Sequence, residues 1–259
     1  MPKTAEGAIA RRVAAYGLTP GEPIEFDPSW WGRIYGLIKT EHLSGLAAAA
    51  AGEGTLAVSD EQRDELAALH TDDMMWTLAL ERALLAIAGA AREDGVDLIV
   101  LKGPALAHTF YPDPSWRAFG DIDLLVRTRD WRKACALLER LGFHRQRPEP
   151  RAGFDERYGK AAVHVNGAGL NVDLHRTLVV GPFGLWMQPE ELFERTVPFE
   201  VAGVALRRLD DTAILLHACV HAALGFMEPL LMPARDVAQV AQQGDVDWDE
   251  VGILARRWK

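Results

Sequence analysis

The hydrophobic pattern of the chain changes its period near residue 92, and this change limits the folds that the chain can adopt. Residues 1–92 repeat apolar side chains at helical spacing. Short apolar runs bounded by glycine and proline follow, beginning with "VDLIVLKG", and the pattern turns mostly helical again from residue 186. We therefore expect an α+β fold: a small mixed β-sheet core at 93–185 with flanking helices, a helical N-terminal region at 1–92 and a mostly helical C-terminal region at 186–259.

The longest helical pattern carries its own start and stop signals. Ser59 with Gln62 forms a capping-box pattern at its beginning, and Gly95 is a suitable end. The length of the pattern predicts either one long helix or two helices broken near Thr71.

The central part reads as strands and short helices in alternation. The apolar run before Lys102 predicts a buried strand, and Pro104 then suits the first turn of a helix. The run "DIDLLV" predicts a second strand, and "AAVHVNGAGLNVDLHRTL" predicts two strands joined by a glycine-containing turn.

Composition narrows the classes of function. The net charge of −9 argues against a general nucleic-acid binder, which needs a basic face, but it leaves room for a small polyanionic substrate held through a metal. Cys135 and Cys219 lie in apolar helical patterns and suggest a reducing compartment without disulfides. Since no stretch has the roughly 18 apolar residues of a membrane helix, we expect a cytoplasmic protein with no membrane partner.

Asp121 and Asp123 carry the most specific chemical signal in the chain. Residues i and i+2 of a strand project to the same face, so these two carboxylates lie close together and repel unless a cation separates them. Asp173, on a later strand, supplies a third carboxylate. An all-oxygen set of this kind suits one or two Mg²⁺ ions that also bind substrate phosphates. The alternative for the Asp pair is a solvated strand edge or turn, and for Asp173 the end of a strand.

A second element of the site comes from three residues that precede the Asp pair in the sequence: Lys102, Gly103 and Arg117. Gly103 ends a strand and opens a helix, where backbone N–H groups receive a phosphate. Lys102 either contacts a phosphate or carboxylate or extends to the surface. Arg117 either clamps a phosphate or pairs with one of the neighbouring aspartates. His175 shares a strand face with Asp173 and is a substrate contact, a hydrogen-bond donor behind the ligands or a structural histidine.

His217 and His221 stand four residues apart on an apolar helix, a spacing that suits Zn²⁺. No third ligand accompanies them in the sequence, and Cys219 is expected to face elsewhere. We therefore expect both histidines to lie in the core or near the nucleotide.

Four stretches in order along the chain resemble a known family. They are "LKGPALAHTFYPDPSWRAFGDIDLLV", "ACALLERLGF", "VDLHRTL" and "LLHACVHA". They resemble the uncharacterised nucleotidyltransferase group of the polymerase-β-like superfamily over residues 80–240. The usual Gly-Ser of the superfamily appears here as "KG", so a phosphate-binding hydroxyl is missing.

The resemblance implies roles for the candidate residues. Asp121 and Asp123 would hold the metals, and Asp173 would be a third ligand and the base towards an acceptor hydroxyl. Lys102, Gly103 and Arg117 would bind the triphosphate of an NTP. The resemblance also suggests a role in tailoring natural products or peptides. The alternatives are a non-catalytic protein that binds a nucleotide or peptide in the same cleft, and a metal-dependent phosphohydrolase.

Overall fold

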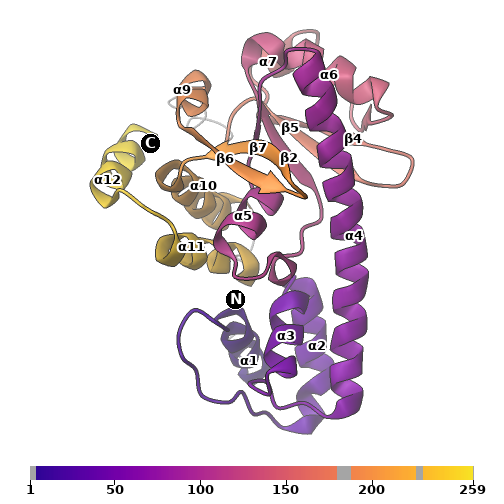
Figure 1. Cartoon of the computed structure of the whole chain (residues 1–259), viewed down its shortest axis with the longest axis vertical. Coiled ribbons are helices and arrows are strands. Elements are labelled where there is room, and N and C mark those ends of the chain that lie inside the picture. The colour runs from indigo at the N-terminus through magenta and orange to yellow at the C-terminus, as the bar shows by residue number, and fades with distance from the viewer. Residues whose placement is uncertain (1–3, 180–187, 226–229, 259) are drawn as a thin grey trace.

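One long helix, α4, connects the two ends of the molecule. The computed structural model describes residues 4–179, 188–225 and 230–258. Helices α1–α3 pack on one end of α4, and the β-sheet with its helices packs on the other end (Figure 1). Within the described residues the helices are α1 (Ala5–Ala14), α2 (Trp31–Thr40), α3 (Ser44–Gly52), α4 (Asp60–Glu93), α5 (Gly103–Phe110), α6 (Trp131–Arg140), α7 (Phe154–Arg157), α9 (Pro189–Glu194), α10 (Asp211–Leu224), α11 (Leu231–Gln243) and α12 (Trp248–Arg257), with short 3-10 turns at η1 (Pro28–Trp30), η2 (Pro114–Trp116) and η3 (Thr128–Asp130).

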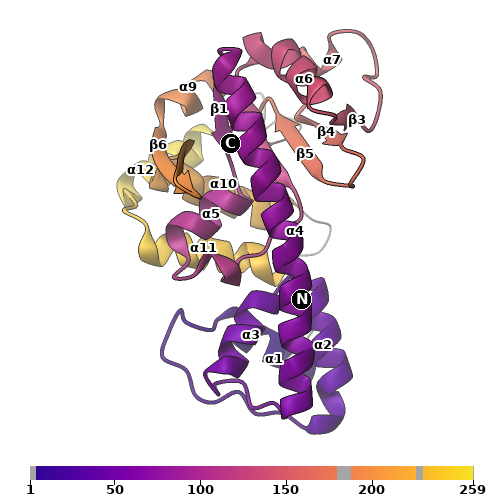
Figure 2. The same cartoon turned by 45° about the vertical axis from the view of Figure 1, so that its right-hand side comes forward.

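The main sheet has five strands in the order β1-β2-β5-β4-β3. The strands are β1 (Leu98–Val100), β2 (Ile122–Val126), β3 (His144–Arg145), β4 (Ala161–Val165) and β5 (Asn171–His175). Strands β2 and β5 pair in parallel, while the other neighbours in this sheet pair antiparallel. A separate hairpin of β6 (Thr196–Val201) and β7 (Val204–Leu209) contacts β1 (Figure 2). The mixed sheet and its helices confirm the expected fold class.

The apolar side chains form two clusters, which share α4. The N-terminal core joins α1–α3 and the first half of α4, and it also takes in Leu231 and Met232 from α11. The sheet core begins at Leu80 of α4 and ends at Trp258. The hydrophobic contacts therefore divide α4 between two cores.

The capping signals at the start of α4 are confirmed. The Ser59 hydroxyl accepts from the Gln62 N–H, and the Gln62 side chain accepts from the Ser59 N–H. The helix continues without a break past Thr71 and ends before Gly95, whose φ of +64° is the left-handed conformation that glycine adopts readily. The strands expected around residues 98–100, 122–126, 161–165 and 171–175 are also present. The boundary expected between residues 185 and 186 lies outside the described residues.

One stretch of α4 differs from the expectation that no part of the chain is long and apolar enough for a membrane helix. Among the described residues, one helix is long and apolar enough to cross a bilayer by length and composition, with a window of mean hydropathy 1.4 that is 28% buried. Its apolar residues Leu80, Leu84 and Ile87 pack into the sheet core, and a core helix of a folded domain passes the same test.

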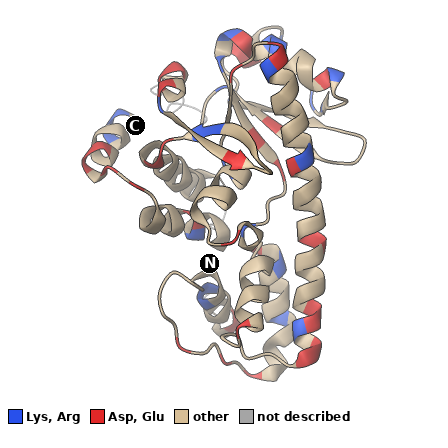
Figure 3. Cartoon of the chain, viewed as in Figure 1, with Lys and Arg blue, Asp and Glu red and all other residues tan. Residues whose placement is uncertain are grey.

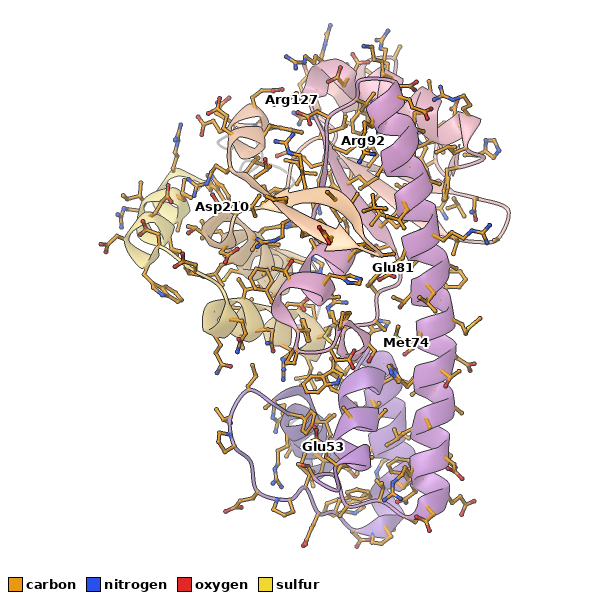
Figure 4. All side chains as sticks on the ribbon, in the orientation of Figure 1. Glu53, Met74, Glu81, Arg92, Arg127 and Asp210 are labelled. Carbon is orange, nitrogen blue, oxygen red and sulfur yellow. The ribbon has the colours of Figure 1, made fainter. Side chains whose placement is uncertain are left out.

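Charged residues are found at both ends of α4 and on most of the elements around it (Figure 3). Glu81 of α4 points towards α5 (Figure 4), where its carboxylate lies 2.6 Å from His108 Nε2. Arg92, the last residue but one of α4, donates to the Ala205 carbonyl of β7. These contacts hold α4 against the elements that carry the candidate site.

Candidate active site

The parallel pairing of β2 and β5 brings two acidic residues together. Asp123 lies directly opposite Asp173 in the register of the two strands. Asp121 stands two residues before Asp123, just ahead of β2, and therefore on the same side of the chain. The three carboxylates predicted from the sequence consequently lie together near the N-terminal ends of two central strands, although more than 40 residues separate these strands in the sequence.

A group of three side chains has the composition of a metal site. One ligand atom from each of Asp123, Asp173 and His175 lies within 4.8 Å of the others. This set differs from the predicted trio, because His175 belongs to it and Asp121 stands beside it. The buried Nδ1 atom of His175 has no hydrogen-bond partner among the described residues. Two carboxylates and an imidazole suit a divalent cation, so the residues present fit the ion that the sequence predicts.

The cation beside Asp123 in this structure is a lysine. Lys102 Nζ lies 2.8 Å from Asp123 Oδ1, and His175 Nε2 lies 2.8 Å from the same oxygen. Asp123 and His175 are each only 2% exposed. Burial raises the pKa of Asp123, but Lys102 and the hydrogen bond from His175 outweigh it and hold that pKa well below its usual range. Asp123 is therefore ionised in the folded protein.

The pKa values of Asp121 and Asp173 are shifted in the opposite direction, above the usual value of an aspartate. Burial and the negative charge of Asp123 raise the pKa of Asp121 to about 6. The same two causes raise the pKa of Asp173, against the opposing effect of His175 and Lys102. Asp121 and Asp173 thus hold negative charge at a free-energy cost that an additional cation would relieve.

Gly103 opens α5 at the end of β1, as the sequence predicts. Its φ of +34° is left-handed, and a Cβ atom there would lie 3.1 Å from the Phe119 ring. No side chain caps the first turn of α5, so its backbone N–H groups have no side-chain acceptor. Lys102, Gly103, Asp121 and Asp123 line one side of a cavity of about 310 Å³.

Arg117 also borders this cavity, but its ion-pair partner is a residue of α11. The guanidinium donates to both carboxylate oxygens of Asp236, at 2.8 and 2.9 Å, and to the Ala118 carbonyl. The Tyr111 hydroxyl donates to the same carboxylate at 2.7 Å. These bonds use three of the five N–H donors of the guanidinium. The pairing with Asp121 or Asp123 considered from the sequence is thus replaced by a buried contact to α11.

The segment between Arg117 and Asp121 is braced by α4. Trp76 Nε1 donates to the Gly120 carbonyl at 3.3 Å, and the Thr77 hydroxyl lies 3.5 Å from the Phe119 N–H. Because these contacts join residues more than 40 positions apart, nothing in the local pattern of the sequence predicted them.

Helix α10 presents its two histidines to the same region. His217 is buried, and burial together with Lys102 holds its pKa well below the usual value. Burial and Lys102 likewise lower the pKa of His221 to about 4. Cys219 is exposed, in keeping with the expectation that it faces elsewhere. Both histidines are neutral at pH 7 and line a small cavity of about 30 Å³ beside Lys102.

Sequence reasoning missed two residues that border the site. Lys160, just before β4, is half-buried and lines the small cavity with Lys102; burial and Lys102 lower its pKa. His42, between α2 and α3, lines the larger cavity. Lys160 immediately precedes the predicted strand that pairs with the Asp173 strand, so its position was a usable signal. No local signal points to His42.

Comparison with known proteins adds a family match. The model of a family described as "Uncharacterised nucleotidyltransferase" matches residues 27–259. No curated protein matches the chain in sequence.

Solved structures with a related fold are distant. A solution structure of the antibiotic-resistance factor ANT(2'')-Ia shares 15% identity with a TM-score of 0.48, covering 70% of this chain and 91% of that one. A crystal structure of ANT(2'')-Ia in complex with adenylyl-2''-tobramycin shares 17% identity with a TM-score of 0.46, covering 68% and 95%. An antigenic nucleotidyltransferase-like protein from Paracoccidioides brasiliensis shares 14% identity with a TM-score of 0.37, covering 66% and 75%.

Proposed function

This chain belongs to the uncharacterised nucleotidyltransferase family, and from that premise we propose that it transfers a nucleoside monophosphate from an NTP to an acceptor hydroxyl. The acceptor oxygen forms a bond to the α-phosphorus, the bond from that phosphorus to the β-phosphate oxygen breaks, and pyrophosphate leaves. The hydroxyl proton passes to a carboxylate of the site. No oxidant or reductant takes part.

The observation that carries this proposal is the register of β2 and β5. It sets Asp123 opposite Asp173, with His175 close enough to share one divalent ion with them. Asp121 stands within electrostatic reach of both carboxylates. We propose Mg²⁺ as the ion, held by Asp123, Asp173 and Asp121 with His175 in contact. A divalent ion bound there would neutralise phosphate oxygens and make the acceptor hydroxyl more acidic.

The lysines supply positive charge for the triphosphate. Lys102 is paired with Asp123, and Lys160 forms no ion pair with any residue that the structure describes. Burial and Lys102 lower the pKa of Lys160, and the nearby carboxylates of Asp123 and Asp173 offset only part of this effect. We propose that the triphosphate lies between Lys102 and Lys160, against the uncapped first turn at Gly103.

Asp173 is the proposed base. It lies opposite Asp123 on β5 and is only partly buried, so its carboxylate is placed to take the proton of an acceptor hydroxyl that approaches the ion. Arg117 keeps two N–H donors for a phosphate while its bonds to Asp236 fix its position. The phosphate role of Arg117 stays a prediction, as does a place in natural-product or peptide tailoring.

The experiment measures binding and product together. Wild-type protein should bind ATP by calorimetry only when Mg²⁺ is present, and should release pyrophosphate when an acceptor is supplied. The double variant Asp121→Asn with Asp123→Asn should lower ATP affinity by at least about tenfold, since it removes the charges that hold the ion. Asp72→Asn, which alters an exposed carboxylate on α4, is the matched control and should bind as the wild type does.

Two outcomes count against the proposal. Unchanged MgATP affinity in the double variant would show that these carboxylates hold no ion, as in a non-catalytic binding protein. Release of inorganic phosphate in place of pyrophosphate would favour the phosphohydrolase.

A further inference from the structure

The long helix α4 leaves apolar side chains in water. Its most apolar window has a mean hydropathy of 1.4, yet only 28% of that window is buried. Met75 is 65% exposed, Leu78 53% and Trp76 38%. Figure 2 shows α4 running along the front of the molecule, with none of the described elements drawn over it. Large apolar side chains exposed together on one helix indicate a surface that binds a partner.

The exposed side of α4 follows a heptad spacing. Six residues recur along it at alternating intervals of four and three positions, and all are exposed except the half-buried Ala79. We call these residues the α4 face: Ala68, Asp72, Met75, Ala79, Arg82 and Ala86. Such a spacing places side chains along one seam of a helix, where a second helix packs. Because half of these residues are alanines, the backbones of two helices can come close together there.

The two charges of the α4 face are complementary about a twofold axis. The side chains of Asp72 and Arg82 form no hydrogen bond or ion pair with any residue that the structure describes. They lie about 15 Å apart along the helix, so they cannot pair within one chain. Both stand five positions from Thr77. A second α4 that packs antiparallel and is centred on Thr77 therefore sets each Asp72 beside Arg82 of the second copy, and Met75 beside Ala79.

An apolar groove flanks the α4 face on the side of the sheet core. It has a volume of about 390 Å³, and its apolar wall is formed by Ala79, Ala83, Ala86, Leu141, Phe143 and Leu170. Met75 of the second copy is level with Ala79, at the wall of this groove. The antiparallel contact thus covers apolar surface beyond the helix itself.

A lipid bilayer fits the α4 face less well than a second helix does. Asp72 and Arg82 lie within the face, on either side of Met75 and Ala79. A charged side chain inside the hydrocarbon layer costs free energy, whereas an opposite charge on a second copy compensates it. The charges therefore favour a second copy of the chain over a membrane.

We propose that the α4 face binds a second copy of this chain, and that the two α4 helices pack antiparallel about Thr77 in a twofold-symmetric dimer. Two equivalent ion pairs between Asp72 and Arg82 fix the register of the helices, and Met75 and Leu78 are removed from water. The inference does not depend on the proposed transferase activity, since no residue of the α4 face lines the two cavities beside the carboxylates.

The test is reversal of one charge and its rescue by reversal of the other, with the dimer dissociation constant measured by sedimentation. The wild-type chain should sediment at twice the mass of one copy at micromolar concentration. Asp72→Arg places like charges side by side at two points of the contact, so it should raise the dissociation constant by about tenfold or more. Arg82→Asp should have the same effect. The double variant Asp72→Arg with Arg82→Asp restores opposite charges and should return the dissociation constant to within about threefold of the wild type.

Two further variants complete the set. Asp249→Arg reverses an exposed charge on α12 and is the matched control, which should dimerise as the wild type does. Met75→Gln keeps the length of the side chain but makes it polar, and it should raise the dissociation constant by about tenfold, because two copies lose apolar contact. Thermal melting checks that each variant is folded. If a single charge reversal does not fold, Met75→Gln and the double variant still test the contact.

Several results would overturn the inference. A wild-type chain that stays monomeric up to about 100 μM would show that the α4 face does not bind a second copy. A dimer that neither charge reversal weakens would place the contact elsewhere, and a double variant as weak as the single ones would rule out the antiparallel register. Binding of the monomer to phosphatidylcholine vesicles, lost in Met75→Gln, would assign the face to a bilayer.

Discussion

The N-terminal core and the sheet core are built from the same kinds of apolar side chain, but they differ in what lies at their edges. The N-terminal core packs fully buried residues such as Ile34, Ile38 and Leu46 with few polar groups among them. The sheet core ends at a set of buried charges that includes Asp123, Arg117 and Asp236. The first region is stabilised mainly by apolar packing, whereas the second holds charged groups out of water to form a site.

The junction between the two cores is polar. Arg235 of α11 donates to the carbonyls of Ala14 and Tyr16, and Glu41 accepts from the Leu231 N–H. Directional bonds of this kind fix one relative placement of the two regions, which apolar contact alone specifies less strictly. The comparison teaches that the active-site cavity depends on both cores, although all three carboxylates come from one.

The largest expected effect comes from breaking the buried ion pair of Arg117 and Asp236, among the charges at which the sheet core ends. Asp236→Asn leaves Arg117 buried and without its ionic partner, so we expect the free energy of unfolding to fall by about 3–5 kcal/mol in denaturant titration. The exposed pair of Arg257 and Glu191 is the matched control. Glu191→Gln should change stability by less than about 1 kcal/mol. Equal effects of the two variants would mean that burial does not increase the contribution of the Arg117–Asp236 pair to stability.

Truncating the apolar N-terminal core should have a slightly smaller effect. Leu46 is fully buried on α3, and Leu46→Ala should lower the free energy of unfolding by about 2–4 kcal/mol, through lost transfer energy and a cavity. MgATP affinity of the folded variant, measured by calorimetry, should remain that of the wild type, because Leu46 belongs to the N-terminal core and lines neither cavity of the site. A parallel loss of ATP affinity would show that the two cores are coupled more tightly than we propose.

The smallest expected effect is a gain in stability, from a substitution of Asp121. Because the pKa of Asp121 is raised from 3.8 to about 6, the folded state binds its proton more tightly than the unfolded state, and stability falls as pH rises through this interval. Without metal, Asp121→Asn should therefore stabilise the protein at pH 7.5 by about 1–2 kcal/mol. The gain should shrink as the pH is lowered through about 6, measured by thermal melting in a chelator.

The stabilities of the wild type and of Asp121→Asn can also be compared with Mg²⁺ added. The wild type should gain stability from the ion and the variant should gain less, since a ligand stabilises only the form that binds it. Asp249→Asn, at an exposed position on α12, should leave stability unchanged in both conditions. A variant that is destabilised in the chelator would contradict the raised pKa.

Much of the secondary structure was predictable because its signals are local. The Ser59 capping box, the glycine that ends α4 and the Gly169-containing turn between β4 and β5 each act within a few residues. The Asp-x-Asp pair and Asp173 were likewise identifiable, because alternation along a strand fixes which side chains share a face.

The partners of the site residues were not predictable from those signals. His175 was among the candidates, but its bond to Asp123 spans 52 residues, and the bond from Arg117 to Asp236 spans 119. The placement of Lys160 and His42 beside the carboxylates depends on how β4 and the α2–α3 junction pack against the rest of the chain. No short-range pattern encodes such distances.

The sequence by itself determined the chemical groups of this protein and the family to which it belongs: three aspartates, the Lys-Gly turn and the alternation of strands and helices. Only the tertiary structure decided which of those groups meet. Side-chain direction along a strand or helix follows from local backbone geometry, but the pairing of distant strands and the closure of a cavity follow from the packing of the whole chain.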